Sequence, residues 1–307
     1  MALEPEFSPA SVRFPTSGHI WVPASGRRGA AAGVSMHSPC TIPAVFAQRV
    51  LWSAVRIFGP WVLPGVRESW DEPVAHSTWE HFTAEWIEAF GRWDSAALYR
   101  RPQASRSGCS LLLLRDGRGV GFVRITTDAQ RAEREFTVMS SVWAARPASF
   151  AIARPVGVGH SSGLSWVGSE SVPNYPLGAV RKPAVRERVA AEIADILDTA
   201  LTRSDAIPSA WRGSHGDLSP WNLRTELTGR VRVIDWEDAA FAPAGVDSLY
   251  GAVTAHLTFG TPLPSKADGA AAGWIESVVE KRLAPDEAPH SLNNRMLQIV
   301  RDLPAQL

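Results

Sequence analysis

A short polar segment, residues 215–222 (His-Gly-Asp-Leu-Ser-Pro-Trp-Asn), carries the residue types of a reaction centre. Asp217 and Asn222 are five residues apart, and Asp235 follows thirteen residues beyond Asn222 at the end of a β-rich run. An Asp and an Asn at this spacing on a loop can point into one small volume, and an Asp at a strand end can face them. Two such oxygen donors suit Mg²⁺, and the remaining Asp can accept a proton from an attacking hydroxyl. Phosphoryl transfer requires these parts.

The same segment resembles the aminoglycoside phosphotransferase family, whose members are small-molecule kinases with a protein-kinase-like fold. The resemblance rests on His-Gly-Asp-Leu-x-x-x-Asn at 215–222 and on Ile-Asp-Trp-Glu at 234–237. It is strongest over residues 213–249, is weaker from about 96 to 260, and does not include residues 1–75.

The resemblance implies a role for each polar residue of the segment. Asp217 is expected to be the catalytic base, and Asn222 and Asp235 are expected to bind Mg²⁺. Ser219 lies where such kinases often contact the γ-phosphate. His215 is expected to hydrogen-bond within the loop rather than to act as a catalyst. The implied co-substrate is ATP, and the implied acceptor is a small-molecule hydroxyl of the aminoglycoside, sugar or amino-alcohol type.

The resemblance also implies a phosphate-gripping lysine on a strand of the first lobe, paired with a Glu on the following helix. The strand at 121–125 is in the right place but carries Arg124. On the next helix, Glu133 and Glu135 are both candidates for the pairing. Glu135 lies about 60° from the centre of the apolar face and Glu133 about 100° from it. We therefore expect Glu135 to pair with Arg124.

The basic residues are strongly biased toward arginine. The chain has only three lysines, Lys182, Lys266 and Lys281, so 28 of its 31 basic residues are arginines. No lysine in the first half can therefore replace Arg124, and arginine is not equivalent to lysine at a phosphate site. Two interpretations follow. Either Arg124 does the work of the lysine, or the chain is a catalytically weak, pseudokinase-like nucleotide-binding scaffold.

Hydrophobic periodicity predicts the elements that must position these residues. Strands are predicted at 19–22, 96–99, 109–114, 120–125, 155–158, 164–169 and 231–234. Helices are predicted at 42–63, 77–90, 130–143, 185–200, 248–259, 273–283 and 292–303. Asp116-Gly117 predicts a tight hairpin, and Ser77-Thr78-Trp79-Glu80 predicts a capping-box helix start.

This order of elements predicts an α+β fold, and the resemblance makes it a two-lobed, protein-kinase-like fold. A small β-rich N-lobe at 76–172 is expected to clamp the nucleotide, and a mostly helical C-lobe at 173–307 to carry catalysis and acceptor binding. Residues 1–75 are expected to be an N-terminal extension. The loop at 103–108 is a candidate phosphate cover, and the backbone near 170–172 is a candidate adenine hinge.

Composition limits the other function classes. The 31 basic residues balance 31 acidic ones, so we expect no nucleic-acid partner. Two cysteines, Cys40 and Cys109, exclude a disulfide scaffold and a cysteine-built zinc site. The acidic start is not typical of a secretory signal, so the expected location is cytoplasmic. A metal hydrolase using His215, Asp217 and Asp235 is a weaker alternative, because no other His or carboxylate has the spacing to complete the ligand set.

The most apolar stretch is the predicted helix at 42–63. Arg49, Arg56 and Pro60 interrupt it, so it is a poor match to a membrane span, and we expect none. Its apolar residues mostly share one helical side, which predicts packing on a domain. The alternative is an interfacial membrane helix with the two arginines at the lipid headgroups.

Two further predictions concern single residues. Asp247 is expected to cap the helix that follows it. The thirteen tryptophans are expected to lie mainly in the core, with Trp221 and Trp236 as candidate pocket residues. Glu237 and Asp238 are candidate contacts of the metal or the acceptor.

Overall fold

The protein is described from a computed structural model, and its described residues are 10–15, 18–100, 108–283 and 291–304. The chain divides into two units, which are described separately. Unit 1 comprises residues 1–136 and 153–177, and unit 2 comprises residues 137–152 and 178–307.

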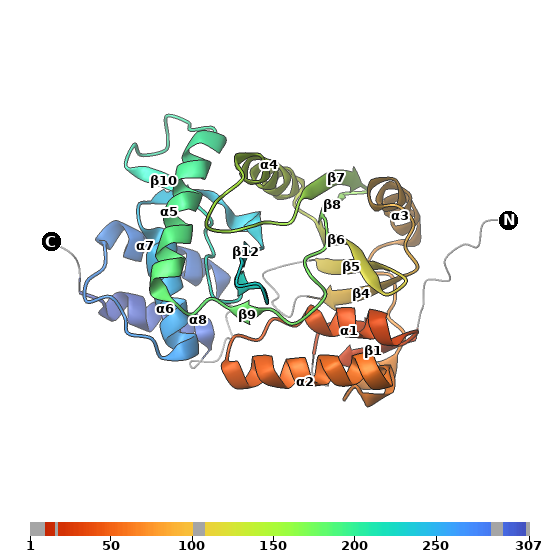
Figure 1. Ribbon diagram of the computed structural model, residues 1–307. Helices are drawn as coiled ribbons and strands as arrows, with labels where there is room; N and C mark the ends of the chain where they lie inside the picture. The colour runs from red at the N-terminus through yellow and green to blue at the C-terminus, as the bar shows by residue number, and fades with distance from the viewer. Residues whose placement is uncertain (1–9, 16–17, 101–107, 284–290, 305–307) are drawn as a thin grey trace. The chain divides into compact units, whose positions relative to one another are not determined.

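Unit 1 is built on an eight-stranded sheet in which every neighbouring pair is antiparallel (Figure 1). The order across the sheet is β3 (Val66–Glu68), β1 (Ser11–Phe14), β2 (Ile20–Pro23), β4 (Ser95–Arg100), β5 (Cys109–Arg115), β6 (Arg118–Thr126), β8 (Leu164–Ser169) and β7 (Pro155–Ser161). The predicted strands of this half are therefore present. Asp116 and Gly117 form the turn between β5 and β6 with φ of 51° and 69°, as a tight hairpin requires.

Strand β5 is buried on both faces because successive side chains point to opposite sides of the sheet. Leu111 and Leu113 join one core cluster with the tryptophans of α3 (His76–Phe90). Leu112 and Leu114 join a second cluster that contains Ala32 of α1 (Arg27–Ser35). A strand of this kind requires covering elements on both sides.

The N-terminal residues supply one of these covers. Residues 1–75, expected to be an extension, contribute β1, β2 and β3 to the same sheet, together with α1, α2 (Ile42–Phe58) and the 3₁₀ turn η1 (Pro60–Val62). Helix α1 has no stripe of large apolar residues, which is why periodicity did not predict it. It packs through small side chains: a Cβ at Gly33 would lie 2.9 Å from Cγ1 of Val22.

The predicted capping box of α3 is wrong. The helix begins at His76, with Ala75 at its N-cap and no side-chain capping bond. Thr78 and Trp79 are each 2% exposed. Burial of Thr78 and Trp79, rather than a hydroxyl cap, therefore stabilises the start of the helix.

Unit 2 is mostly helical. Its helices are the second part of α4 (Ala129–Ala145), α5 (Pro183–Ala200), α6 (Val246–Phe259), α7 (Gly269–Arg282) and α8 (Leu292–Asp302). A three-stranded sheet has the order β12 (Val231–Val233), β11 (Leu223–Thr225) and β9 (Gly178–Ala179), and β10 (Trp211–Ser214) pairs with β13 (Ala240–Pro243). The predicted α+β class, β-rich first and mostly helical second, is confirmed.

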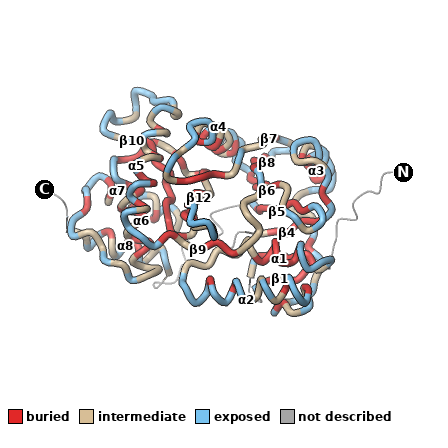
Figure 2. The backbone as a smooth tube through the Cα atoms, in the orientation of Figure 1, coloured by how far each residue is buried: buried red, intermediate tan, exposed pale blue. Residues whose placement is uncertain are grey.

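Aromatic side chains fill much of the core of unit 1, which Figure 2 shows as buried segments. Trp79 packs edge-on against Trp70 and Trp86 at ring-centroid distances of 5.9 and 5.3 Å, a favourable geometry for aromatic pairs. Burial raises the pKa of the Cys109 thiol to about 12, so this side chain packs as a neutral group. In the described part of the chain, no helix is both long and apolar enough to cross a membrane.

Candidate active site

The β11–β12 hairpin positions Asn222 and Asp235. Leu223 pairs with Val233, and one step further the amide of Ile234 donates to the carbonyl of Asn222 at 3.0 Å. Asn222 directly precedes β11, and Asp235 directly follows Ile234. The antiparallel register therefore holds the two candidate metal ligands at the same end of one hairpin.

The candidate base is tied to the same end of this hairpin. The Nδ2 atom of Asn222 donates to the carbonyl of Asp217 at 3.0 Å. The amide of Ser219 also donates to that carbonyl at 2.8 Å, and the amide of Asn222 donates to the carbonyl of Ser219 at 3.0 Å. The structure thus brings together three residues that the sequence separates by eighteen positions, Asp217, Asn222 and Asp235.

Asp235 adopts an unusual backbone conformation. Its φ and ψ are 67° and 66°, in the left-handed region of backbone conformation that residues other than glycine rarely adopt. Such conformations cost about 1–3 kcal/mol and are concentrated at functional sites. The turn into η2 (Trp236–Asp238) imposes this conformation on the residue that is the candidate metal ligand.

Asp247 anchors the other end of the loop. Its carboxylate accepts hydrogen bonds from the Ser214 hydroxyl at 2.8 Å and from the amides of His215 and Gly216 at 2.7 and 3.1 Å. The predicted helix cap is therefore wrong: Asp247 lies inside α6, whose N-cap is Gly245 without a side-chain bond. Sequence spacing could not show this, because the three donors precede Asp247 by more than thirty residues.

Opposing influences act on the pKa of the Asp247 carboxyl. Burial raises this pKa above its ordinary value, while the charge of His215 and the three hydrogen-bond donors oppose the shift. Gly216 is confined in the same region, with φ 78° and a hypothetical Cβ only 2.4 Å from the carbonyl of Asp238. Only glycine fits this position without displacing the backbone.

His215 makes the loop contacts predicted for it. Its Nε2 atom lies 3.1 Å from the carbonyl of Ile234, and the amide of Asp217 lies 3.3 Å from Nδ1. The ring packs 4.7 Å from the ring of Trp236. His215 is fully buried and connects the loop at 215–222 to the strand that leads into Asp235. Trp236 belongs to the same core cluster as Phe150, so it packs in the core rather than lining a pocket.

Arg282 is a site residue that the sequence did not indicate. Its guanidinium, near the end of α7, donates to Oδ2 of Asp238 at 2.8 Å and to the Tyr250 hydroxyl at 2.9 Å. Burial lowers the pKa of Arg282, but the electrostatic effects of Tyr250, Asp217 and Asp238 exceed it, and the net pKa is raised. A permanent positive charge therefore acts on the carboxylates of this loop.

Ser219 contributes to the shape of the loop. The residue is fully buried, and its backbone carries the turn between Asp217 and Asn222. The γ-phosphate contact that the resemblance implied for Ser219 stays a prediction, because the geometry supports only the turn.

Unit 1 contains the predicted ion pair. Arg124 of β6 donates to Glu135 of α4, and both residues are 6% exposed. Glu133 instead contacts His160 at 2.6 Å on an exposed surface. Helical geometry therefore identified the correct partner. Most of the candidate phosphate loop at 103–108 lies outside the described residues.

The donor set of unit 2 fits a magnesium ion shared with phosphates. Because the Asn222 amide nitrogen donates to Asp217, the amide oxygen remains for a cation, and Asp235 adds a carboxylate. Magnesium at nucleotide sites is commonly held by one or two carboxylates with substrate phosphates and water. Within the described ranges, no group of three or more His, Cys, Asp and Glu residues has the arrangement of a metal site.

The chain is therefore an α+β protein whose helical unit carries Asp217, Asn222 and Asp235 in neighbouring loops. No protein-family model and no curated protein matches the chain. Among solved structures, it is similar to an amicoumacin kinase at 9% identity, covering 74% of this chain and 95% of that one, with a TM-score of 0.49. It is similar to spectinomycin phosphotransferase APH(9)-Ia at 6% identity, 75% and 99% coverage and a TM-score of 0.47. It is also similar to aminoglycoside phosphotransferase APH(4)-Ia at 15% identity, covering 56% of this chain and 75% of that one, with a TM-score of 0.39.

Proposed function

We propose that this protein is an ATP- and Mg²⁺-dependent phosphotransferase that moves the γ-phosphoryl group to a hydroxyl of a small molecule. One observation carries the proposal. The register of the β11–β12 hairpin holds Asn222 and Asp235 at one end, and the Asn222 side chain is hydrogen-bonded to the backbone of Asp217. This arrangement of the backbone supports a carboxylate for the nucleophile together with two oxygen donors for a cation, which is the minimum set for phosphoryl transfer.

In this mechanism, Asp217 orients the acceptor hydroxyl and accepts its proton. The hydroxyl oxygen forms the new bond to the γ-phosphorus while the bond between that phosphorus and the β–γ bridging oxygen breaks, and ADP leaves with the electron pair. Asn222 and Asp235 would hold Mg²⁺, which would supply neutralisation of the charge on the phosphates. The hydrogen bonds around the Asp217 carbonyl keep the loop in place, so little reorganisation is needed during the reaction.

Nucleotide binding gives the first test. Mg-ATP at about one hundred times its Kd is expected to stabilise the protein by about 2.7 kcal/mol, seen as a rise in Tm. Asp235→Ala should abolish the rise that depends on Mg²⁺. Asp205→Ala, at an exposed Asp of the same unit, should retain it. The metal-binding role of Asp235 is disproved if Asp235→Ala keeps the full Mg-ATP effect.

Turnover gives the second part of the test. ADP release is measured with aminoglycosides, sugars and amino alcohols as acceptors. Acceptor-dependent ADP release supports the phosphotransferase. Tight binding of Mg-ATP with no turnover on any acceptor supports the second candidate, a nucleotide-binding scaffold. The observation behind that candidate is Arg124 in place of lysine, with its guanidinium already paired with a buried carboxylate.

Arg124 separates these two candidates more directly. If its guanidinium also contacts the ATP phosphates, Arg124→Ala should lower kcat/KM for ATP about tenfold to a hundredfold, the range for one charged hydrogen bond. Arg124→Lys should restore much of this loss, since it keeps the charge and the pairing with Glu135. Arg13→Ala, which breaks a partly exposed ion pair with Glu68 in the same sheet, is the control.

Arg124→Ala also leaves Glu135 buried without its cation, so a loss of stability must be separated from a loss of binding. The double variant Arg124→Ala/Glu135→Ala removes both charges and serves this purpose. An unchanged KM for ATP in the folded double variant would contradict a phosphate-binding role for Arg124.

A further inference from the structure

Helix α2 and the following turn η1 present an apolar surface outward from unit 1. Six of the eleven exposed large hydrophobic side chains in the described part of the chain lie within residues 42–61. They are Ile42, Phe46, Val50, Ile57, Phe58 and Trp61, with exposed fractions between 53% and 67%. Figure 2 shows the exposed residues running along α2. Such a concentration marks an interaction surface, because isolated exposed apolar residues are ordinary but clusters are not.

The geometry of α2 separates this surface from the side that packs on unit 1. At 100° per residue, Ile42, Phe46, Val50 and Ile57 fall within about 80° of the helix circumference. The buried side chains Val45, Gln48 and Val55 lie on roughly the opposite side. Helix α2 is therefore apolar on two sides, and only one of them is used by the fold.

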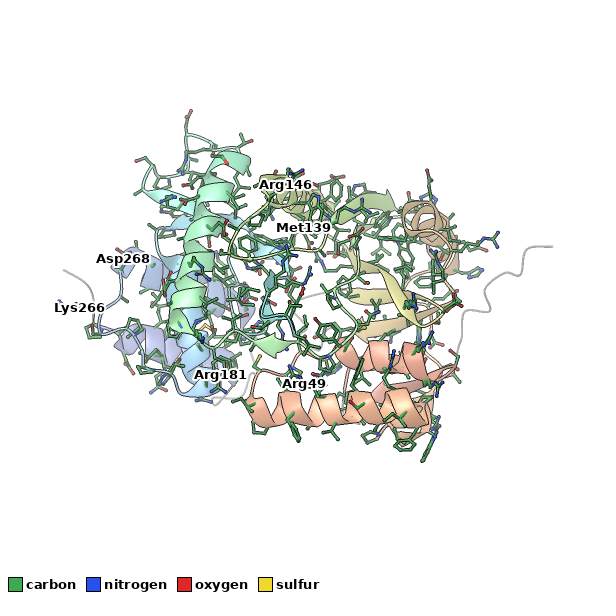
Figure 3. All side chains as sticks on the ribbon, in the orientation of Figure 1. Arg49, Met139, Arg146, Arg181, Lys266 and Asp268 are labelled. Carbon is green, nitrogen blue, oxygen red and sulfur yellow. The ribbon has the colours of Figure 1, made fainter. Side chains whose placement is uncertain are left out.

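Positive charge borders the outward apolar side. Arg49 and Arg56 are seven residues apart, so they lie on one flank of the apolar stripe. Both are exposed, and Arg49 is labelled in Figure 3. Arg56 also stacks over the ring of Trp52 at 5.4 Å, which holds its guanidinium along the helix.

The charge bias extends well beyond the helix. Residues 7–67 contain six arginines and no Asp or Glu, although the whole chain has a net charge of zero. The segment thus combines exposed aliphatic and aromatic side chains and flanking arginines, with no Asp or Glu in residues 7–67. This combination is typical of helices that lie in the plane of a membrane interface, where anionic headgroups meet the basic side chains.

We propose that the outward face of α2 and η1 docks the protein on an anionic lipid surface, with Phe46, Val50 and Ile57 inserted and Arg49 and Arg56 at the headgroups. A second copy of the chain fits this face less well. A two-fold interface places the same patch on both sides, so the arginine flanks of two copies meet a surface with no carboxylate from residues 7–67. Anionic headgroups supply the missing negative charge.

The test is co-sedimentation of the full chain with vesicles of phosphatidylcholine alone or of an equimolar mixture with phosphatidylserine. We expect binding to the mixed vesicles and weak binding to the neutral ones. Arg49→Gln/Arg56→Gln should lower affinity for the mixed vesicles roughly thirty-fold, since each basic residue near such a surface contributes about fivefold. The charge-matched control Arg188→Gln/Arg230→Gln changes two exposed arginines elsewhere and should bind normally.

The apolar side chains are tested in parallel. Phe46→Ser/Ile57→Ser should lower binding at least about tenfold, because two large apolar side chains no longer enter the lipid. Leu227→Ser, at a side chain that is 69% exposed, is the matched control. All substituted positions are exposed, so the Tm of each variant and its binding of Mg-ATP should match the parent protein.

Three results would overturn the proposal. The first is equal binding to vesicles with and without phosphatidylserine. The second is a loss of vesicle binding in the control variants equal to the loss in the α2 variants. The third is a dimer in light scattering that Phe46→Ser/Ile57→Ser dissociates while vesicle binding is absent, which would assign the face to self-association. None of these results depends on kinase activity, so the docking surface and the proposed reaction succeed or fail separately.

Discussion

Asp217→Asn should lower kcat by about 10²–10⁴-fold, the usual contribution of a positioned general base. The amide has nearly the shape of the carboxylate but cannot accept the hydroxyl proton. The loop around it is held by backbone atoms: the carbonyl of Asp217 accepts from Asn222 and Ser219, and its amide contacts His215. These contacts remain in the variant, so the fold and the affinity for Mg-ATP should be preserved. The expected signature is a loss in kcat with little change in KM for ATP.

The control for this variant is Asp205→Asn. Asp205 is an exposed carboxylate of the same unit that the mechanism does not use. We expect only a small change in kcat. ADP release under saturating ATP, together with the Mg-ATP thermal shift, measures both effects. Near-normal turnover by Asp217→Asn with any acceptor that the parent phosphorylates would eliminate Asp217 as the base.

Asp247→Ala should cause a larger loss in the free energy of unfolding than the other substitutions proposed in this unit. The carboxylate accepts from one hydroxyl and two amides, and all four residues concerned are buried or nearly so. An unsatisfied buried donor costs about 1 kcal/mol or more. The three donors together predict a loss of roughly 3 kcal/mol in the free energy of unfolding. Urea unfolding followed by circular dichroism measures it.

Asp268→Ala is the matched comparison for Asp247. Asp268 is the N-cap of α7 and accepts a single hydrogen bond from the amide of Ala271 at 2.9 Å. Loss of such a cap costs about 1 kcal/mol. Equal losses from the two substitutions would show that Asp247 does not anchor the loop. We also expect Asp247→Asn, which keeps one acceptor oxygen, to fall between Asp247→Ala and the parent.

The anchor also has a consequence for activity. Because Asp247 binds the backbone immediately before Asp217, it is a positioning residue for the base. Below its unfolding transition, Asp247→Asn should lower kcat more than it changes KM for ATP. Asp268→Ala should change neither. A kcat unchanged in the folded Asp247→Asn variant would reduce Asp247 to a purely structural residue.

The predictions that held rest on local physics. Helices α5, α6, α7 and α8 and strands β4, β5, β6 and β8 each follow from periodic burial of one or both faces, which a single stretch of sequence records. The hairpin at Asp116-Gly117 follows from the positive φ that its turn requires. The pairing of Arg124 with Glu135 follows from helical geometry within a separation of eleven residues.

Two of the failures, the missed helix α1 and the role assigned to Asp247, concern long-range contacts. Helix α1 is buried through alanine and glycine, whose small side chains produce no amphipathic signal until β5 requires a cover for Leu112 and Leu114. Likewise, the sequence around an Asp does not show whether its side chain caps a helix or anchors a distant loop. Asp247 has its three donors only because the end of β10 and the two residues after it lie beside the start of α6 in the folded chain.

The sequence by itself determined the chemistry available in this protein: an Asp, an Asn and a second Asp at spacings suited to one site, and an arginine where a lysine was expected. It also determined most helices and strands, because their stability depends on neighbours in the chain. Tertiary structure alone decided what holds that chemistry in place. The anchoring of the loop by Asp247, the contact of His215 with the carbonyl of Ile234, and the pairing of Arg282 with Asp238 all depend on residues distant in sequence, whose contacts exist only once the chain has folded.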